Sequence, residues 1–437
     1  MSTSVETPST KGENRVSSAA EWFKYGVLGL MYMAQTFPAG FVGALVPTIY
    51  REQGLPLEMF WVFSIPLIPY WFRWVWAPIV DSYGSARFGR RKSWFVPTTI
   101  LAVGVYMSLA LVDIGLGVLG IVITILFVKS LVTATQEVAI DAYMVDNLTP
   151  QERSRGAAIV SMFEVFGHMT ALAVLGMVYE AYGWRIAVVL ASFLMLLFLL
   201  PGFVRREPPL PAATLERWNA GERPSLIRFL KRRDSRVIGP LLIFAGLYTG
   251  ATVPLIGPFL VDRGYSVGQV GVITGVTLFS AVMVGSVLGM VLLKRYGIKA
   301  VLSGLLVVIL PASVPLVSVV WMDLEVSTLA IGALVGLPTT VLAVFSVALN
   351  TLRLGFASKL QAGTDYSIGG ALSRIGQTAS LAAGGVISAY AGWSGFWFVH
   401  AIVGICVLYV GYLAHDWLEA EVAARNERET GIGEALG

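Results

Sequence analysis

Twelve long apolar segments divide this chain and limit its fold more than any other feature of the sequence. A helix needs about 20 mostly apolar residues to cross a bilayer, because its backbone polar groups must be bonded within the segment. We predict an all-α membrane protein with twelve such helices, at residues 25–48, 58–80, 94–112, 116–145, 154–181, 184–202, 236–261, 267–293, 298–321, 328–353, 364–391 and 393–414.

The composition agrees with a membrane protein. Only 13% of the 437 residues are charged, whereas soluble domains average about 25%. The net charge of +4 could suit a nucleic-acid partner, but the basic residues lie between apolar segments, so we expect membrane lipid and no nucleic acid. Cys406 is the single cysteine, which excludes an intramolecular disulfide and a cysteine-based zinc site. We expect no bound metal and no cofactor.

The distribution of Lys and Arg predicts the orientation of the chain. With the N-terminus in the cytoplasm, 25 of the 31 basic residues fall in cytoplasmic segments or at the helix ends that border them. Three lie within predicted spans: Arg73, Lys129 and Arg374. A wrong helix count would scramble this alternation, so it favours twelve spans with both termini cytoplasmic.

The longest polar interruption divides the chain into two sets of six helices. It holds a proline cluster and nine basic residues between Arg205 and Arg236, typical of a solvated linker. The predicted organisation is a disordered cytoplasmic tail, a six-helix bundle, a cytoplasmic linker, a second six-helix bundle and a cytoplasmic tail, at 1–22, 23–203, 204–235, 236–415 and 416–437.

The two halves also resemble each other. Gly183-Trp184 precedes Gly392-Trp393 by 209 residues, and the same offset relates residues 164–168 to 373–377. A repeat of half the chain is typical of transporters with a central site between two bundles. The alternative is a chance coincidence of Gly and aromatic residues.

A motif follows the second predicted helix. It contains the runs Trp76-Ala77-Pro78, Asp81 and Gly89-Arg90-Arg91-Lys92. This loop resembles the helix 2–3 motif of the major facilitator superfamily, and residues 136–143 and 150–158 are similar to AmpG-type permeases and their relatives, the acetyl-CoA transporters and siderophore importers. The resemblance implies two pseudo-symmetric six-helix bundles and a cytoplasmic gate. The expected gating residues are Asp81, Arg87, Arg90, Arg91 and Asp146.

Two departures from the family pattern bear on function. Lys294-Arg295-Tyr296-Gly297 replaces the acidic residue in the second half, so only the first loop is expected to gate. Muropeptide permeases typically have two further helices, and the present length is closer to the siderophore importers. Both solute classes therefore stay open.

Four polar residues form a stripe on the fourth predicted helix: Lys129, Thr133, Glu137 and Asp141. Their four-residue spacing places them on one face over about 18 Å. A charge on the lipid face would cost at least about 2.5–3.5 kcal/mol, so the stripe should face inward. We predict that Glu137 or Asp141 carries a proton and that Lys129 contacts an anion. The alternative is a purely structural set of internal ion pairs.

Other intramembrane polar groups have two interpretations each. Glu164 and His168, at i and i+4, could exchange a proton near neutral pH or only pack the bundle. Arg73 could bind a carboxylate or phosphate of the solute, or pair with Asp141. Arg374 has the same ambiguity, with Asp365 as its structural partner.

The resemblance also implies that the first, fourth, seventh and tenth helices line the cavity. Tyrosines with a carboxylate and a lysine suit a zwitterionic or anionic amphiphile better than a simple sugar. The predicted substrate-binding residues are Tyr32, Gln35, Arg73, Lys129, Thr133, Tyr248, Asn350 and Arg374.

These observations predict a secondary transporter in the inner membrane of a bacterium. We expect proton-coupled import of a small organic solute, muropeptide- or siderophore-like, by alternating access, with a monomer as the working unit. An exporter of drugs or metabolites is the alternative on the same scaffold. A membrane-embedded enzyme is disfavoured, because the three histidines are scattered and have no metal-ligand spacing.

Overall fold

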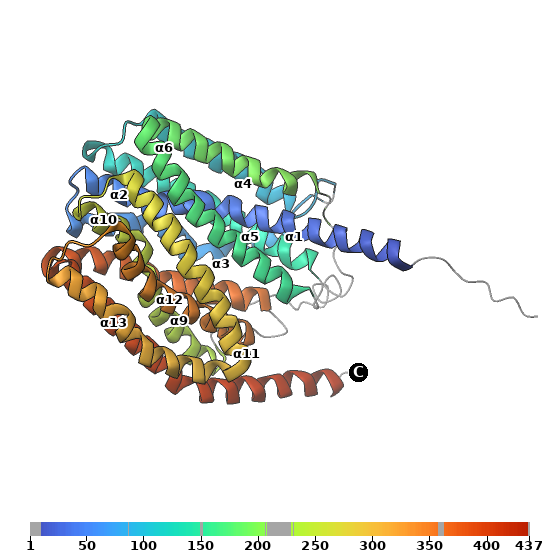
Figure 1. Cartoon of the computed structure of the whole chain (residues 1–437). Coiled ribbons are helices and arrows are strands. Elements are labelled where there is room, and N and C mark those ends of the chain that lie inside the picture. The colour runs from blue at the N-terminus through green and yellow to red at the C-terminus, as the bar shows by residue number, and fades with distance from the viewer. Residues whose placement is uncertain are drawn as a thin grey trace, which may run out of the picture.

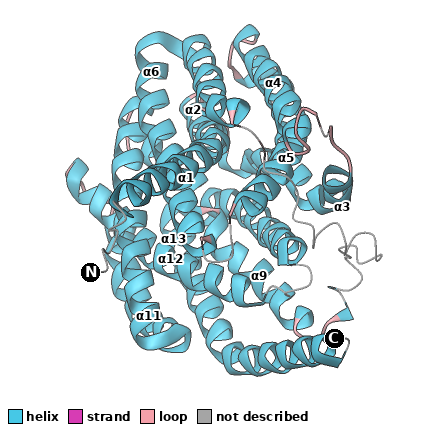
Figure 2. Ribbon diagram, turned by 90° about the vertical axis from the view of Figure 1, so that its right-hand side faces the viewer, coloured by secondary structure: helices cyan, strands magenta, loops and turns pink. Residues whose placement is uncertain are grey.

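The computed structural model describes residues 10–85, 87–148, 152–205, 207, 229, 231–356 and 362–435, and its regular secondary structure there is helical (Figures 1 and 2). The first half contains α1 (Thr10–Gly40), a π-helical turn η1 (Phe41–Leu45), α2 (Val46–Glu52), the 3₁₀ segment η2 (Leu57–Leu67), α3 (Ile68–Ser82), α4 (Lys92–Ser108), η3 (Leu109–Leu111), η4 (Leu116–Val118), α5 (Leu119–Asn147) and α6 (Arg153–Val204). The second half contains α9 (Ser235–Gly250), α10 (Thr252–Asp262), α11 (Val267–Trp321), α12 (Thr328–Phe356) and α13 (Ala362–Ala435).

Glycines divide the three longest helices. Gly183 in α6, Gly297 in α11 and Gly392 in α13 have φ values of 81°, 78° and 69°, a region that side chains with a Cβ rarely adopt. Each glycine falls between two predicted spans. Every predicted range is therefore helical apart from Val112 and Ala251. Eight helices in the described ranges are long and apolar enough to cross a membrane, and the count of twelve crossings stays a prediction.

The predicted internal repeat has a counterpart in how helices cross within each half. A Cβ on Gly40 of α1 would lie 2.6 Å from the carbonyl oxygen of His168 on α6. In the second half, a Cβ on Gly250 of α9 would lie 2.3 Å from the Cα of Gln377 on α13. Both halves thus bring two backbones together at glycine, at positions related by almost the same sequence offset.

The two halves pack differently at the two ends of the molecule. Figure 1 shows the free ends of α1 and α13 projecting from one end, which we call the terminal end. At the opposite end one core joins both halves, with Phe41 and Trp184 beside Phe259 and Trp397. Toward the terminal end the cores are separate: the buried members of one lie within residues 25–199 and those of the other within 229–418.

An ion pair and close backbone contacts join the two halves at the opposite end. Arg51 donates from Nε to Asp262 Oδ1 at 2.6 Å and from Nη2 to Oδ2 at 2.9 Å, and the indole of Trp393 donates to the same carboxylate at 2.8 Å. A Cβ on Gly271 of α11 would lie 2.5 Å from the carbonyl oxygen of Leu172 on α6. Because Gly271 has no side chain, the backbones of the two halves can come this close.

We predict that Gly271→Val opens the opposite end, because Leu172 contributes a backbone atom that cannot rotate away. The readout is thiol labelling of purified protein that carries Thr48→Cys, at a position 1% exposed, in a Cys406→Ser background. Labelling should rise at least several-fold. The matched control is Gly304→Val, since a Cβ at Gly304 meets no atom within 4 Å. Equal labelling in both variants would contradict this account of closure.

Candidate functional site

An ionic cluster lies between the halves, formed by α3, α5, α6 and α13. Its core is an ion pair between Arg73 Nη1 on α3 and Glu137 Oε2 on α5, separated by 2.7 Å. Asp141, one turn further along α5, lies 3.8 Å from the same nitrogen and accepts a hydrogen bond of 2.7 Å from the hydroxyl of Tyr32. We define the ionic cluster as Arg73, Lys129, Glu137, Asp141, Glu164 and Arg374.

The carboxylates of this cluster are only partly enclosed. The side chains of Arg73 and Glu137 are 13% and 17% exposed, and that of Asp141 is 32% exposed. Both carboxylates come from the predicted stripe, so its i, i+4 spacing does place them side by side. The structural alternative for Arg73, a bond to Asp141, is present as the longer of its two contacts.

Lys129 and Arg374 approach the cluster from opposite halves. Lys129 on α5 is 3% exposed, and Arg374 on α13 is exposed. The guanidinium carbon of Arg374 lies 5.4 Å from the centre of the Tyr70 ring, and the Tyr70 hydroxyl is 2.8 Å from Thr133 Oγ1. Thr133 in turn donates to the backbone carbonyl of Lys129 at 3.0 Å, so Tyr70 lies against the same stretch of α5.

Glu164 and His168 lie on α6 and are half-buried. Glu164 is near enough to Asp141, Glu137 and Arg374 to interact with them electrostatically, although no ion pair joins it to Arg374 in the described ranges. In the described part of the chain no hydrogen bond joins the Glu164 and His168 side chains. Direct proton exchange between them stays a prediction.

Arg353 was not among the predicted site residues, but its guanidinium lies near that of Arg73 at Gly370. A Cβ on Gly370 of α13 would lie 3.1 Å from Nη2 of Arg73 and 3.2 Å from Nη2 of Arg353. Arg353 also donates to Oδ1 of the predicted residue Asn350 at 3.2 Å. Two guanidinium groups from different halves therefore meet at one glycine. The sequence places Arg353 at a helix end and gives no signal of this convergence.

The structure gives new information on two predicted substrate-binding residues, Tyr248 and Gln35, and on the suggested partner of Arg374. Tyr248 is 1% exposed and packs on His400 and Phe345 in the core of the second half, so the structure does not place it at the cluster. Asp365 pairs with Arg232, so the structural partner suggested for Arg374 is wrong. Gln35 has a buried amide nitrogen with no hydrogen-bond partner in the described ranges.

The predicted gating motif forms a second charged group at the terminal end. Asp146 at the end of α5 accepts from Nε of Arg91 at 3.0 Å and from Nη2 of Arg90 at 3.3 Å. Arg87 is exposed and has no ion pair within the described ranges. The side chain of Asp81 lies outside the described part of the structure.

Glu207 completes this group, although no sequence pattern singled it out. Its carboxylate accepts from the backbone nitrogens of Arg91 at 3.0 Å and Lys92 at 3.3 Å, at the N-terminus of α4. A carboxylate there satisfies unpaired N–H groups and complements the helix dipole. Gly89, at φ 110°, lets the loop turn and leaves room, since its Cβ would lie 2.6 Å from Glu207 Oε2.

We predict that Glu207→Ala destabilises the protein by about 0.5–2 kcal/mol, the usual value of a helix N-terminal cap. Unfolding in detergent micelles, followed by tryptophan fluorescence, measures the loss. Glu325→Ala is the control, because Glu325 is exposed in a loop. A loss no larger than that of the control would show that Glu207 does not cap α4.

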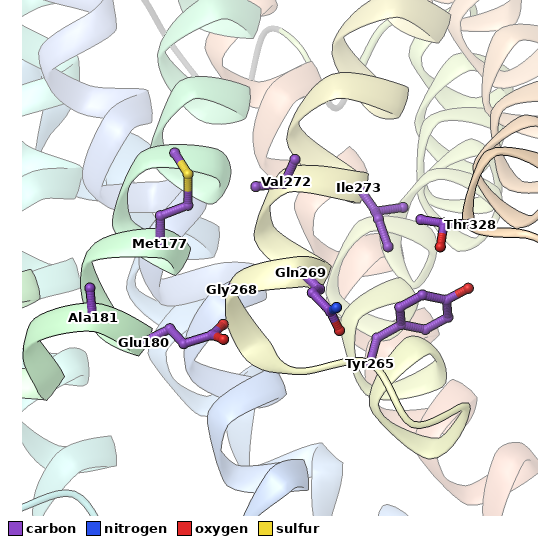
Figure 3. Close-up of a pocket in the computed structure, with 9 residues that line it drawn as sticks. All are labelled: Met177, Glu180, Ala181, Tyr265, Gly268, Gln269, Val272, Ile273 and Thr328. Atoms are coloured by element: carbon purple, nitrogen blue, oxygen red, sulfur yellow. The ribbon is translucent and has the colours of Figure 1, made fainter.

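A pocket of about 470 Å³ opens between α6 and α11 at the opposite end (Figure 3). Its lining is mostly apolar, and its carboxylate, Glu180, accepts a hydrogen bond of 2.8 Å from the Ser266 hydroxyl. None of the ionic-cluster residues lines it. The candidate functional site is therefore the ionic cluster and not this pocket.

We predict that Arg73 and Glu137 stabilise the fold as a coupled pair. Removing one partner of a buried ion pair typically costs about 3–5 kcal/mol. The loss should be smaller for Glu137→Met, because Asp141 still lies 3.8 Å from Arg73. Arg73→Met and Glu137→Met should each destabilise the protein, and the double variant should recover much of the loss. Denaturant unfolding in micelles gives the coupling free energy.

The control for this cycle is a pair with the same separation but high exposure. Arg185 and Asp113 are also 2.7 Å apart, yet their side chains are 63% and 84% exposed. Their coupling should be at most about 1 kcal/mol. Coupling of similar size in both cycles would contradict a special role for the buried pair.

The chain has two repeated helical halves that are joined at one end and have charged residues between them. This arrangement defines a membrane protein of the secondary-transporter class. The chain belongs to the Major Facilitator Superfamily, whose sequence profile matches residues 28–359. It is therefore an integral membrane protein of a transporter family, and the predicted fold class is confirmed.

Sequence comparison also supports the predicted branch. The chain is 25% identical to the anhydromuropeptide permease of Escherichia coli strain K12 over 405 residues, which cover 88% of this chain and 79% of the permease. The resemblance to AmpG-type permeases is thus confirmed.

Solved structures share the fold at lower identity. A D-xylose–proton symporter superposes with a TM-score of 0.64 at 15% identity, over 89% of this chain and 96% of the symporter. A bacterial homologue of the human lysosomal transporter Spinster, described as inward-facing and unoccupied, gives 0.63 at 14% identity, over 92% and 97%.

Proposed function

We propose that this protein is a proton-coupled importer of a muropeptide-like solute in the inner membrane of a bacterium, with both termini cytoplasmic. The observation that carries the proposal is the Arg73–Glu137 ion pair, which lies between the halves and is partly exposed. A carboxylate in this position can gain and lose a proton as the halves move. The similarity to an anhydromuropeptide permease supports the solute class.

Each end of the molecule has a distinct part in the proposed cycle. The shared core closes the opposite end, whereas the buried residues toward the terminal end form two cores, one in each half. Basic residues concentrate at the terminal end, which favours a cytoplasmic location for it. In this proposal the structure represents the state from which solute and proton are released into the cytoplasm.

Glu137 is the proposed proton carrier and Arg73 its switch. With the opposite end open, a proton binds Glu137 and weakens its attraction to Arg73, which becomes available to the solute. With the terminal end open, the proton leaves and the ion pair forms again. Asp141, held by Tyr32, keeps a second carboxylate near Arg73 throughout this cycle.

The gating motif acts in the same scheme at the terminal end. Arg90 and Arg91 tie the loop before α4 to Asp146 at the end of α5. This network joins α4 and α5 to the end of α3, the helix that carries Arg73. We propose that it keeps these helices together while the first half rocks against the second.

We predict that Glu137→Gln abolishes uptake driven by a pH gradient but leaves solute exchange, because a neutral side chain cannot carry the proton. The measurement is uptake of a labelled anhydromuropeptide into proteoliposomes, with and without an inward proton gradient. Glu325→Gln is the matched control at an exposed loop position.

Gradient-driven accumulation by Glu137→Gln would remove Glu137 from the coupling mechanism. Solute movement out of the vesicles against its gradient in exchange for entering protons would instead favour export. A wild-type protein that moves a ferric siderophore and no muropeptide would favour the other branch of the family.

A further inference from the structure

We propose that Lys129 and Arg374 form a subsite for an oxyanion, a carboxylate or phosphate group carried by the solute. The inference rests on the proposed transport function and specifies the chemistry of the solute. It starts from two cations that come from opposite halves. Neither of them makes an ion pair within the described residues.

Lys129 is the first cation. It is 3% exposed, and within the described residues no acceptor lies within hydrogen-bond or ion-pair distance of its ammonium group. The ammonium nitrogen is not among the fully buried atoms without a partner, so it keeps some accessible surface. A lysine so nearly enclosed normally has an anionic partner. The carboxylate that interacts with it, Glu137, is already bonded to Arg73 at 2.7 Å.

Arg374 is the second cation. Its charge repels that of Lys129 and is attracted to those of Glu137 and Glu164. No ion pair of Arg374 occurs in the described part of the chain. Its guanidinium lies 5.4 Å from the centre of the Tyr70 ring, and a cation stacked on an aromatic ring has a restricted orientation.

The surroundings favour a fixed subsite over a mobile pair of side chains. Tyr70 is 7% exposed, and its hydroxyl is held by Thr133 at 2.8 Å. The Trp71 indole donates to Thr378 on α13 at 3.1 Å, one turn from Arg374, so α3 and α13 are joined at this level. An oxyanion between Lys129 and Arg374 would be attracted by both charges, and a planar guanidinium can bind it through two N–H groups.

Binding of an acid and its neutral analogue tests the proposal. The probes are an anhydromuropeptide and the same molecule with its carboxyl groups converted to methyl esters. Isothermal titration on the purified full chain measures both. The acid should bind wild type at least about tenfold tighter than the ester, since charge-assisted hydrogen bonds are among the stronger polar contacts.

The variants are Lys129→Met, Arg374→Gln and the double variant, with Lys299→Met as the control because Lys299 pairs with Asp416 on the exposed surface. Each site variant should lower the ratio of acid to ester affinity several-fold, and the double variant should bring it close to one. The ester's affinity should change less than twofold. An unchanged ratio, or equal loss for acid and ester, would overturn the proposal.

The melting temperature of the ligand-free protein shows whether Lys129 binds the solute or stabilises the fold. Lys129 makes no ion pair within the described residues, so Lys129→Met removes no structural partner and should keep or raise the melting temperature. A clear fall in melting temperature would show that Lys129 makes a structural ion pair, and would overturn its assignment to the oxyanion subsite.

A second arm distinguishes failure of the subsite from failure of the proposed solute. Acetate and inorganic phosphate are titrated in thermal-shift experiments at constant ionic strength. Stabilisation of wild type by either ion, lost in Lys129→Met and Arg374→Gln but kept in Lys299→Met, supports the subsite even if no muropeptide binds. The ion with the larger shift identifies carboxylate or phosphate chemistry. No shift with either ion in wild type would overturn the subsite.

Discussion

The cost of holding charge inside a membrane governs the arrangement of this protein. An ionised side chain in hydrocarbon must be paired or reach water, so α5 cannot turn its stripe toward lipid. Glu137 and Asp141 meet Arg73 of α3, and α13 brings Arg374 to the same place. These contacts draw helices of both halves around one set of charges. The position of the site thus follows from the same constraint as the orientation of the helices.

Closure at the opposite end depends on a different constraint: glycines are needed where helices of the two halves touch. Gly271 lets α11 approach the backbone of α6, and Gly257 accommodates Thr48 of α2. Apolar contacts between small residues need no directional bonds, so they can separate without leaving buried polar groups unsatisfied. The ion pair of Arg51 and Asp262 helps to orient the two halves but adds little to stability, since partly hydrated ion pairs contribute little free energy. Such an interface is suited to opening and closing.

The sequence predicted what depends on local geometry and missed what depends on packing. Apolar length predicted the helices, and four-residue spacing predicted that Glu137 and Asp141 share a face. No local pattern could show that Arg353 reaches Gly370, or that Glu207 caps a helix that begins 115 residues earlier. Tyr248 was assigned by helix number alone, but rotation of a helix about its axis decides which residues face the site. The suggested pairing of Asp365 with Arg374 failed for a different reason: its partner, Arg232, lies outside the predicted spans.

The two charged pairs differ in how they relate to the halves, and this difference suggests how proton and solute are coupled. Arg73 and Glu137 both belong to the first half, whereas Lys129 and Arg374 come from different halves. Glu137 interacts electrostatically with all three cations. When it binds a proton, the site becomes more positive and attracts an anionic solute more strongly. By reciprocity the bound anion favours the protonated carboxyl to the same extent. Under our proposals, proton and solute would therefore bind together, and the solute's oxyanion would link the halves during closure.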